Sequence, residues 1–421
     1  MQGALGGAPG AWKDWPAALV LTGDQVYVDD VAAPMLRAIH SLLPRLGLPR
    51  ESLPPADDSQ SWDSSTLYNH PAGYYHRETL LPSHTPTYGL LDLIRGGVER
   101  PVFSSVNASN HLITLAEMLA LYLLTWSPAC WVGLSRVKPP GLAEDDRARY
   151  AVEEAALADF IEDLPAARRL FAHLPVAMMF DDHDITDDWN LSREWEEVVY
   201  SNPLSNRIIG NALVAYLINQ GWGNAPERFP NLMWEGVGRA LREPGGTAHD
   251  DCIDALYRFD EWHFTWPTNP ALVVADTRTR RWRSELAARA PSGLLDWEAL
   301  TDLQQTLKGR EAVVLVTPAP IFGVKLIETV QRVVTWLGHP LAVDAENWMA
   351  HPGAASATLN IFKHPKTPRT FVVLSGDVHY SFVYDVQLRG ATVTADRTSG
   401  RYAAAGCATR SRNGCWIDLI D

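Results

Sequence analysis

Five short runs of the chain are apolar at nearly every position. They comprise residues 17–23, 175–180, 271–276, 312–317 and 370–376. A strand with one face in water alternates apolar and polar residues, whereas a strand buried on both faces is apolar throughout. The five runs are therefore predicted to be strands of a sheet that other layers cover on both faces.

Longer segments between these runs have the length and composition of helices. The predicted helices comprise residues 31–43, 112–126, 144–174 with a break near Pro165, 206–220 and 294–308. The alternation of strands and helices predicts an α/β or mixed fold. Three stretches without a clear period are expected to be irregular, namely residues 48–87, 224–247 and 351–369.

The composition excludes several classes of protein. Of the 421 residues, 46% are hydrophobic and 20% are charged, and this balance is typical of globular proteins. The net charge of −14 argues against a basic face that binds nucleic acid. The longest apolar stretch, residues 112–126, contains Glu117 and is shorter than the ~18 residues that a membrane-spanning helix needs. We therefore expect neither a nucleic-acid partner nor a membrane association.

The amino terminus and the cysteines bear on the cellular location. The first residues lack the basic start and the apolar run of a secretory signal, so a cytoplasmic location is expected. Cys130, Cys252, Cys407 and Cys415 form no Cys-x-x-Cys pair, which argues against a disulfide framework or a thiolate zinc site.

Acidic clusters follow three of the predicted strands directly. Their sequences are GDQVY (residues 23–27), DDHD (181–184) and GDVH (376–379). In open α/β sheets the loops at the carboxyl ends of the strands line the ligand crevice, so we expect the three clusters to converge. Carboxylates brought close together repel one another unless they are protonated or bind cations. Carboxylates and imidazoles bind Fe³⁺, Ca²⁺, Mg²⁺ or Mn²⁺, so the sequence predicts a metal site.

Each cluster also has a purely structural interpretation. A Gly-Asp pair after a strand is commonly a turn or a helix cap, and an acidic run is favourable at the start of a helix. The metal site is indicated by the three clusters together, in this order, rather than by any one of them.

Basic residues follow the predicted strand at 271–276. The guanidinium of Arg278 is predicted to reach the crevice and to hold a phosphate through two hydrogen bonds. Arg280, Arg281 and Arg283 are expected to form a solvated basic helix start.

Five segments together have a specific order and spacing. They are LTGDQVYVDD (residues 21–30), MMFDDHDITDDWN (178–190), NRIIGNALVAYLINQGWGN (206–224), VADTRTRR (274–281) and LSGDVHYS (374–381). This pattern resembles the PhoD-like, or alkaline phosphatase D type, branch of the calcineurin-like metallophosphoesterases, over about residues 17–383. The resemblance implies a four-layer α/β/β/α sandwich with a metal centre at the strand ends.

The resemblance also implies roles for individual residues. Asp24 would bridge two metal positions, and Tyr27 would be a phenolate ligand to a ferric ion. Asp182 occupies the place of an asparagine ligand in related enzymes, and Asp377 and His379 would complete the coordination sphere. The metals implied are Fe³⁺ and Ca²⁺, with Mg²⁺ or Mn²⁺ as alternatives.

The implied catalytic residues are His183 and Asp184, together with Arg278. His183 would contact the phosphate and the leaving oxygen, and Asp184 would orient His183. The expected reaction is hydrolysis of a small phosphate mono- or diester by a hydroxide formed on the metal.

The resemblance divides the chain into three parts. Residues 1–16 are expected to be a flexible segment, residues 17–390 a PhoD-like domain with a long insertion at about 48–110, and residues 391–421 a divergent carboxyl-terminal segment. Family members usually have a further strand upstream that ends in Ser-Cys, whose cysteine ligates iron. We expect this strand and this ligand to be absent here.

Two alternative functions stay open. One is a catalytically impaired member of the same fold that still binds phosphate or metal. The other is a mononuclear iron oxygenase that uses His183, Asp182 or Asp184, and His379. The sequence does not indicate the oligomeric state.

Overall fold

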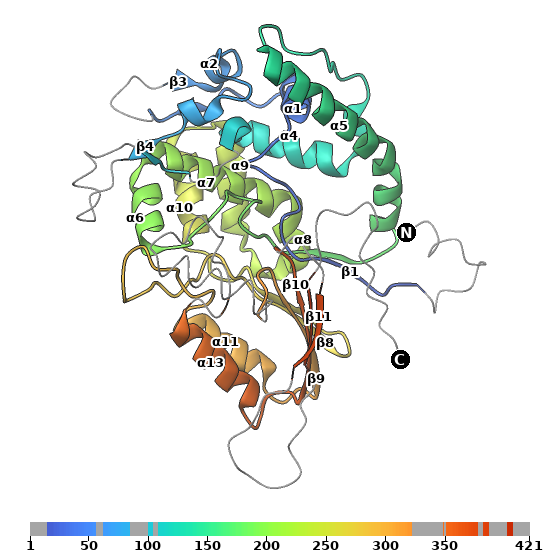
Figure 1. The fold of residues 1–421 in the computed structure, drawn as a ribbon, viewed down its shortest axis with the longest axis vertical. Coiled ribbons are helices and arrows are strands. Elements are labelled where there is room, and N and C mark those ends of the chain that lie inside the picture. Colours follow the sequence, from blue (N-terminus) through green and yellow to red (C-terminus); the bar gives the residue numbers. More distant parts are fainter. Residues whose placement is uncertain are drawn as a thin grey trace.

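The chain has a mixed α/β fold, as the alternation of its apolar runs predicts. Its computed structural model, drawn in Figure 1, describes residues 15–55, 62–84, 100–103, 108–321, 348, 351–377, 382–386 and 402–406. Most of the two predicted terminal segments, residues 1–16 and 391–421, lies outside this part of the chain.

A six-stranded sheet forms the carboxyl-terminal half of the fold. Its strands are β7 (Phe264–Trp266), β8 (Ala271–Val274), β9 (Ala312–Thr317), β10 (Thr370–Ser375), β11 (Phe382–Val386) and β12 (Tyr402–Gly406). They lie in the order β11-β12-β10-β9-β8-β7. The four inner strands are parallel, and β11 and β7 pair antiparallel at the two edges.

A separate parallel pair consists of β1 (Leu19–Leu21) and β6 (Val176–Met178). With this pair, all five apolar runs form strands. The predicted runs are two to four residues longer than β1, β6 and β8, and they match β9 and β10 to within one residue. The sequence did not predict β7, β11 or β12. Thr265 interrupts the apolar residues of β7 and Asp385 those of β11, whereas β12 consists mainly of alanine, which has a low preference for strands.

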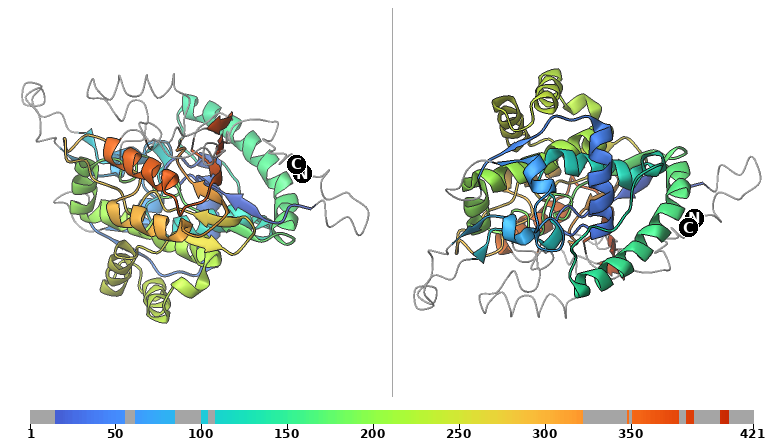
Figure 2. Two further views of the ribbon diagram at one scale, coloured as in Figure 1. Left: turned by 90° about the horizontal axis from the view of Figure 1, so that it is seen from below. Right: turned by 90° about the horizontal axis from the view of Figure 1, so that it is seen from above.

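Helices and the β1–β6 pair cover the two faces of the large sheet. On one face, Val313 and Leu315 of β9 belong to a core beneath α11 (Trp297–Leu307) and α13 (Pro352–Lys363). On the other face, Val314 and Val316 pack into a core shared with β1, β6 and the helices of the amino-terminal half. The prediction that the sheet is covered on both faces is therefore confirmed, and Figure 2 shows α11 and α13 side by side on their face.

The amino-terminal half is mainly helical. Its longer helices are α1 (Ala33–Leu46), α4 (Leu115–Trp126), α5 (Glu144–Phe171), α6 (Arg193–Ser201), α7 (Pro203–Tyr216), α9 (Asn231–Arg242) and α10 (Thr247–Tyr257). A π-helical turn, η5 (Leu217–Gly221), and α8 (Trp222–Asn224) extend α7. The buried helix α4 begins with a capping box in which Thr114 and Glu117 satisfy each other's backbone N–H groups.

Short elements make up the predicted insertion at 48–110. They are β2 (Ser52–Leu53), β3 (Trp62–Asp63), α2 (Ser64–Tyr68), η2 (Arg77–Leu80), β4 (Ser83–His84), β5 (Arg100–Pro101) and η3 (Ala108–Asn110). Two further 3₁₀ turns, η4 (Pro128–Trp131) and η6 (Pro226–Arg228), lie in other connections. The described part of the insertion therefore has several short elements, although its sequence has no clear period.

Three predictions about helices are wrong. The helix α5 continues through Pro165, because this proline is exposed and the carbonyl that loses its hydrogen-bond donor can be hydrated. The stretches 224–247 and 351–369, which were expected to be irregular, contain α9 and α13. Glycines at 236 and 238 weaken the helical signal of α9, and Pro352 stands at the first turn of α13, where proline is favourable.

Within the described ranges, no helix combines the length and the apolar character needed to cross a bilayer. Cys130 and Cys252 are free thiols, whereas Cys407 and Cys415 lie outside these ranges.

Candidate metal centre

Two glycines allow the ends of three strands to approach one another closely. A Cβ atom on Gly23, after β1, would lie 2.5 Å from the Cβ of Asp181, after β6. A Cβ atom on Gly376, after β10, would lie 2.7 Å from the carbonyl oxygen of Thr22. Only glycine avoids both clashes, so the loop after β1 packs directly against the loops after β6 and β10.

An aspartate in a left-handed backbone conformation follows each of these glycines. The φ angles are 54° at Asp24 and 66° at Asp377. Aspartate adopts this conformation more readily than most residues, but it remains uncommon and is concentrated at functional sites. At both positions the glycine of the Gly-Asp pair allows two loops to come into contact, and the aspartate that follows adopts a left-handed backbone conformation.

Four carboxylates meet at this junction. One oxygen from each of Asp24, Asp181, Asp182 and Asp377 lies within 4.8 Å of the others. The prediction that Asp24, Asp182 and Asp377 converge is thus confirmed, and Asp181 joins them. We call these four residues the acidic cluster.

Asp24 lies in an electrostatically unfavourable place within the acidic cluster. Its side chain is buried, and neither carboxylate oxygen has a hydrogen-bond partner among the described residues. Burial raises the pKa of Asp24 well above its usual value, and the charges of Asp181 and Asp182 raise it further. Such a carboxylate must either take up a proton or have a cation beside it.

The donor set fits a hard metal ion. The acidic cluster offers carboxylate oxygens and no thiolate, which suits Fe³⁺, Ca²⁺, Mg²⁺ or Mn²⁺ and not a structural zinc site. The unpartnered oxygens of Asp24 are the observation of this structure that such a cation would explain.

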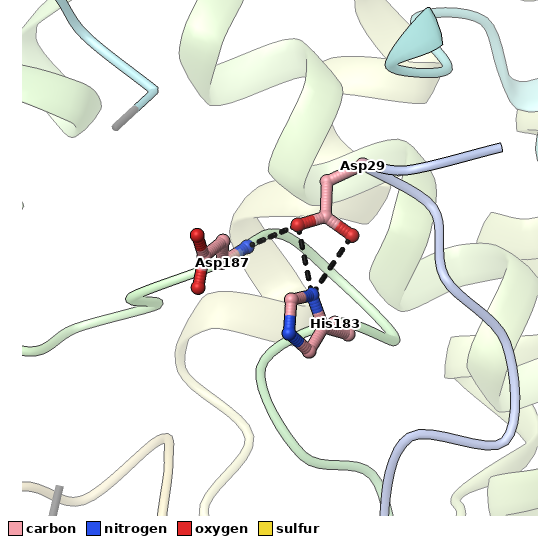
Figure 3. Close-up of side chains that lie close together, drawn as sticks. All are labelled: Asp29, His183 and Asp187. Atoms are coloured by element: carbon pink, nitrogen blue, oxygen red, sulfur yellow. Dashed lines mark hydrogen bonds and ion pairs between the residues drawn. The ribbon is translucent and has the colours of Figure 1, made fainter. Parts of the chain in front are cut away.

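A second group lies beside the acidic cluster and contains His183. Nδ1 of His183 lies 2.9 and 3.1 Å from the two carboxylate oxygens of Asp29, which also accepts a hydrogen bond of 3.0 Å from the backbone N–H of Asp187 (Figure 3). The ring of Tyr27 stacks on the ring of His183 with centroids 4.3 Å apart. Asp29 is fully buried. The ring of His183 is therefore held at Nδ1 by the carboxylate of Asp29 and on one face by the ring of Tyr27.

The predicted role of Asp184 is wrong, because Asp29 and not Asp184 contacts His183. The carboxylate of Asp184 accepts backbone N–H groups from Asp24, Val26 and Asp181 at 2.9, 3.1 and 3.0 Å. Burial raises its pKa to about 7, although these three hydrogen bonds oppose the rise. Asp184 therefore ties the loop after β6 to the loop after β1.

Arg278, which was expected to hold a phosphate, contacts the acidic cluster. Its side chain is fully buried, with Nε hydrogen-bonded to Oδ1 of Asp181 and Nη2 3.1 Å from Oδ1 of Asp182. Burial alone would raise the pKa of Asp182, but the adjacent Arg278 and then His183 lower it. In this structure the guanidinium faces the acidic cluster from the protein interior and not from the solvent side. Arg281, expected to be solvated, is also buried and donates to backbone carbonyls.

Some residues of the site fall outside the sequence prediction or outside the described ranges. His379 lies among the residues that the structure does not describe. No individual role was predicted for Asp29, Asp181 or Asp187. Asp181 belongs to the cluster DDHD (181–184), which was expected to converge with the other two, and Asp187 belongs to the acidic segment that continues it. Asp29 lies in the segment 21–30, in which only Asp24 and Tyr27 were given roles.

Comparison with known proteins identifies no relative of this chain. No family model, no curated protein and no solved structure matches it. Any function is therefore inferred from the residues of the site.

Proposed function

We propose that this chain is a metal-dependent phosphoester hydrolase of the PhoD-like type that acts on phosphate mono- or diesters. The observation that carries the proposal is the acidic cluster at the ends of β1, β6 and β10, together with the two buried oxygens of Asp24 that have no hydrogen-bond partner among the described residues. The finer fold that belongs to this proposal is a four-layer α/β/β/α sandwich, with β1 and β6 in the second sheet.

The metal ligands in this proposal are Asp24, Asp182 and Asp377, with Tyr27 and His379 as further ligands. When bound, the cations supply a hydroxide from water at neutral pH and stabilise negative charge on the phosphoryl oxygens. The negative charge of the whole protein does not prevent substrate binding, because bound cations reverse the local field.

His183 is the proposed acid for the leaving group. Asp29 occupies Nδ1, so Nε2 is the nitrogen that would face a substrate. Burial lowers the pKa of His183, but the carboxylates of Asp29 and Asp182 outweigh burial and raise it above the usual value. A protonated imidazole can donate its Nε2 proton to the departing alkoxide.

Replacing Asp24 tests the proposal. The Asp24→Asn variant loses a negative charge that would hold the cations, so it should lose hydrolysis of a chromogenic phosphodiester. Asp159→Asn is a matched control, because Asp159 is an exposed carboxylate on α5 away from the site. Melting curves of both variants check that the fold is intact. Wild-type turnover in a folded Asp24→Asn protein would contradict the proposal.

Metal analysis of the same preparations separates the two alternative functions. A metal-binding protein without catalytic activity would contain metal and show no turnover of phosphoesters. An iron oxygenase would consume oxygen in the presence of a ketoacid. The geometry offers the oxygenase little support, since Asp184 is engaged by three backbone N–H groups and His183 by Asp29.

A further inference from the structure

A buried arginine lies behind the acidic cluster. Both Arg278 and Asp181 have no exposed surface, and they form a close ion pair through Nε and Oδ1. The same guanidinium reaches Asp182 with Nη2 at 3.1 Å. One side chain therefore contacts two of the four carboxylates from the protein interior.

The backbone of Arg278 is itself fixed on both sides. Its N–H donates to Oδ1 of Asp276 at 2.8 Å, and its carbonyl accepts from Nδ2 of Asn190 at 2.9 Å. Asp276 follows β8, and Asn190 follows the acidic loop after β6. Arg278 thus links these two loops through contacts that need no bound metal.

The charges of the acidic cluster require such a group. Four carboxylates with ligand oxygens within 4.8 Å of one another cannot all stay ionised in a buried place without cations. A fixed guanidinium cancels one of the four charges and remains in place when the metal leaves. Its contacts to Asp181 and Asp182 also hold these carboxylates in one geometry.

We propose that Arg278 is a positioning residue for the metal site, which holds the carboxylates of Asp181 and Asp182 in place before a cation binds. Its positive charge also reduces the net negative charge of the acidic cluster from four to three. Arg278 acts through these carboxylates and does not touch the phosphate. The inference rests on the proposed function, because it takes the acidic cluster to be the metal site.

The variant Arg278→Met tests this role through stability and metal response. Loss of the guanidinium removes the positive charge that forms an ion pair with the buried carboxylate of Asp181, so the metal-free protein should melt lower by roughly 5 °C or more. Mn²⁺ would then replace the missing charge. The rise in melting temperature on adding Mn²⁺ to chelator-treated protein should therefore be larger in Arg278→Met than in the wild type.

A double variant distinguishes charge balance from general damage to the fold. Asp181→Asn combined with Arg278→Met removes both members of the ion pair and restores the net charge, so it should regain at least half of the lost melting temperature. If Arg278→Met does not fold without metal, a double variant that does fold without metal would likewise show that the unbalanced charge caused the loss of stability. Arg280→Met is the control: Arg280 lies in the same loop as Arg278 but pairs with Asp302 of α11, so its loss should leave the Mn²⁺ response unchanged.

Three results would overturn the inference. The first is a Mn²⁺ response of Arg278→Met equal to that of the wild type. The second is a double variant no more stable than Arg278→Met. The third is weakened binding of inorganic phosphate by Mn²⁺-loaded Arg278→Met with unchanged stability, which would mean that Arg278 holds phosphate. By contrast, absence of any Mn²⁺ response and of turnover in the wild type itself would refute the proposed function, and with it the metal role of Arg278.

Discussion

At the scale of single residues, neighbours decide how a buried carboxylate behaves. Glu51 and Glu117 are both almost completely buried. Burial raises the pKa of Glu51 to about 7. The groups that oppose this rise are weak, since the hydrogen-bond partners at 2.8 Å are the neutral amide groups of Asn211 and Leu115, and the charged Arg207 is 3.6 Å away. Burial acts on Glu117 as well, but Arg77 at 2.7 Å and His40 at 2.8 Å lower its pKa below the usual value.

The shift at Glu51 predicts a pH-dependent stability. The folded protein holds the Glu51 proton up to about pH 7, whereas the unfolded chain loses it near the usual 4.5. The stabilisation from Glu51 is therefore complete below pH 4.5 and disappears as the pH rises to 7. Glu51→Gln does not ionise, so its free energy of unfolding relative to the wild type should rise across this range by up to about 3 kcal/mol. Urea unfolding at several pH values measures this difference.

Glu117→Gln serves as the contrast for Glu51→Gln. The pKa of Glu117 is lowered on folding, so its charged form stabilises the protein above pH 4.5. This variant should be less stable than the wild type throughout the same range. A stability difference for Glu51→Gln that does not change with pH would contradict the assignment of a raised pKa.

The contact between Asp29 and His183 predicts a second effect at this scale. Asp29→Asn removes the carboxylate that orients and charges the ring, so phosphodiester turnover should fall by about 100-fold or more. The metal bound by the acidic cluster should stay in place, because Asp29 lies outside this cluster and belongs with His183 and Asp187 to a separate group of possible metal ligands. Steady-state kinetics and metal analysis measure the two quantities. Asp30→Asn, at the adjacent position, is the control, and equal turnover in both variants would exclude the positioning role of Asp29.

At the scale of secondary-structure elements, the loops after β1, β6 and β10 are built for close approach. Gly23 and Gly376 leave no space for a Cβ atom, and the aspartates that follow adopt left-handed backbone conformations. The strands themselves are regular, and the unusual backbone is confined to the residues that bring the carboxylates together. Energetically unfavourable conformations are retained in a fold when the surrounding packing or the function requires them.

The packing of Gly376 predicts the outcome of a single added methyl group. Gly376→Ala forces the loop after β10 away from Thr22, whose backbone oxygen would lie 2.7 Å from the new Cβ atom. We expect a loss of about 1–3 kcal/mol in stability and weaker Mn²⁺ binding, because Asp377 moves away from Asp24. Urea unfolding and calorimetric titration measure these effects. Gly223→Ala, on a helix with open space around the Cβ position, is the control. Unchanged Mn²⁺ affinity in Gly376→Ala would show that this contact does not set the metal geometry.

At the scale of the whole molecule, two large hydrophobic cores lie on opposite faces of the six-stranded sheet. The smaller core lies between α11, α13 and one face of the large sheet. The larger core joins the other face of this sheet to β1, β6 and the helices of the amino-terminal half. The acidic cluster lies where the ends of β1 and β6 meet the end of β10, so both structural halves must be assembled before its four carboxylates come together (Figure 1).

The sequence alone determined five of the strands and the place of the acidic residues that follow three of them. Runs that are apolar at every position fit only between two covering layers, and this constraint acts within each run, so β1, β6, β8, β9 and β10 were predictable. The carboxyl ends of parallel strands share one edge, and this rule predicted that Asp24, Asp182 and Asp377 would converge. The helices α9 and α13 were not predicted. Gly236 and Gly238 weaken the helical signal of α9, and Pro352, which suggests an irregular stretch in the sequence, stands at the first turn of α13, where proline is favourable.

Only the tertiary structure decided which groups pair inside the site. Asp29 and His183 are 154 positions apart, and Arg278 and Asp181 are 97 apart, so no local spacing relates them. The direction of a side chain in a loop depends on the backbone conformation of that loop and on the space left by its neighbours. For this reason the sequence predicted that the charged groups would lie close together, but it did not predict their partners. It predicted that Asp184 would contact His183 and that Arg278 would contact a phosphate. In the folded chain, Asp184 binds backbone N–H groups, and Arg278 faces the carboxylates from the interior.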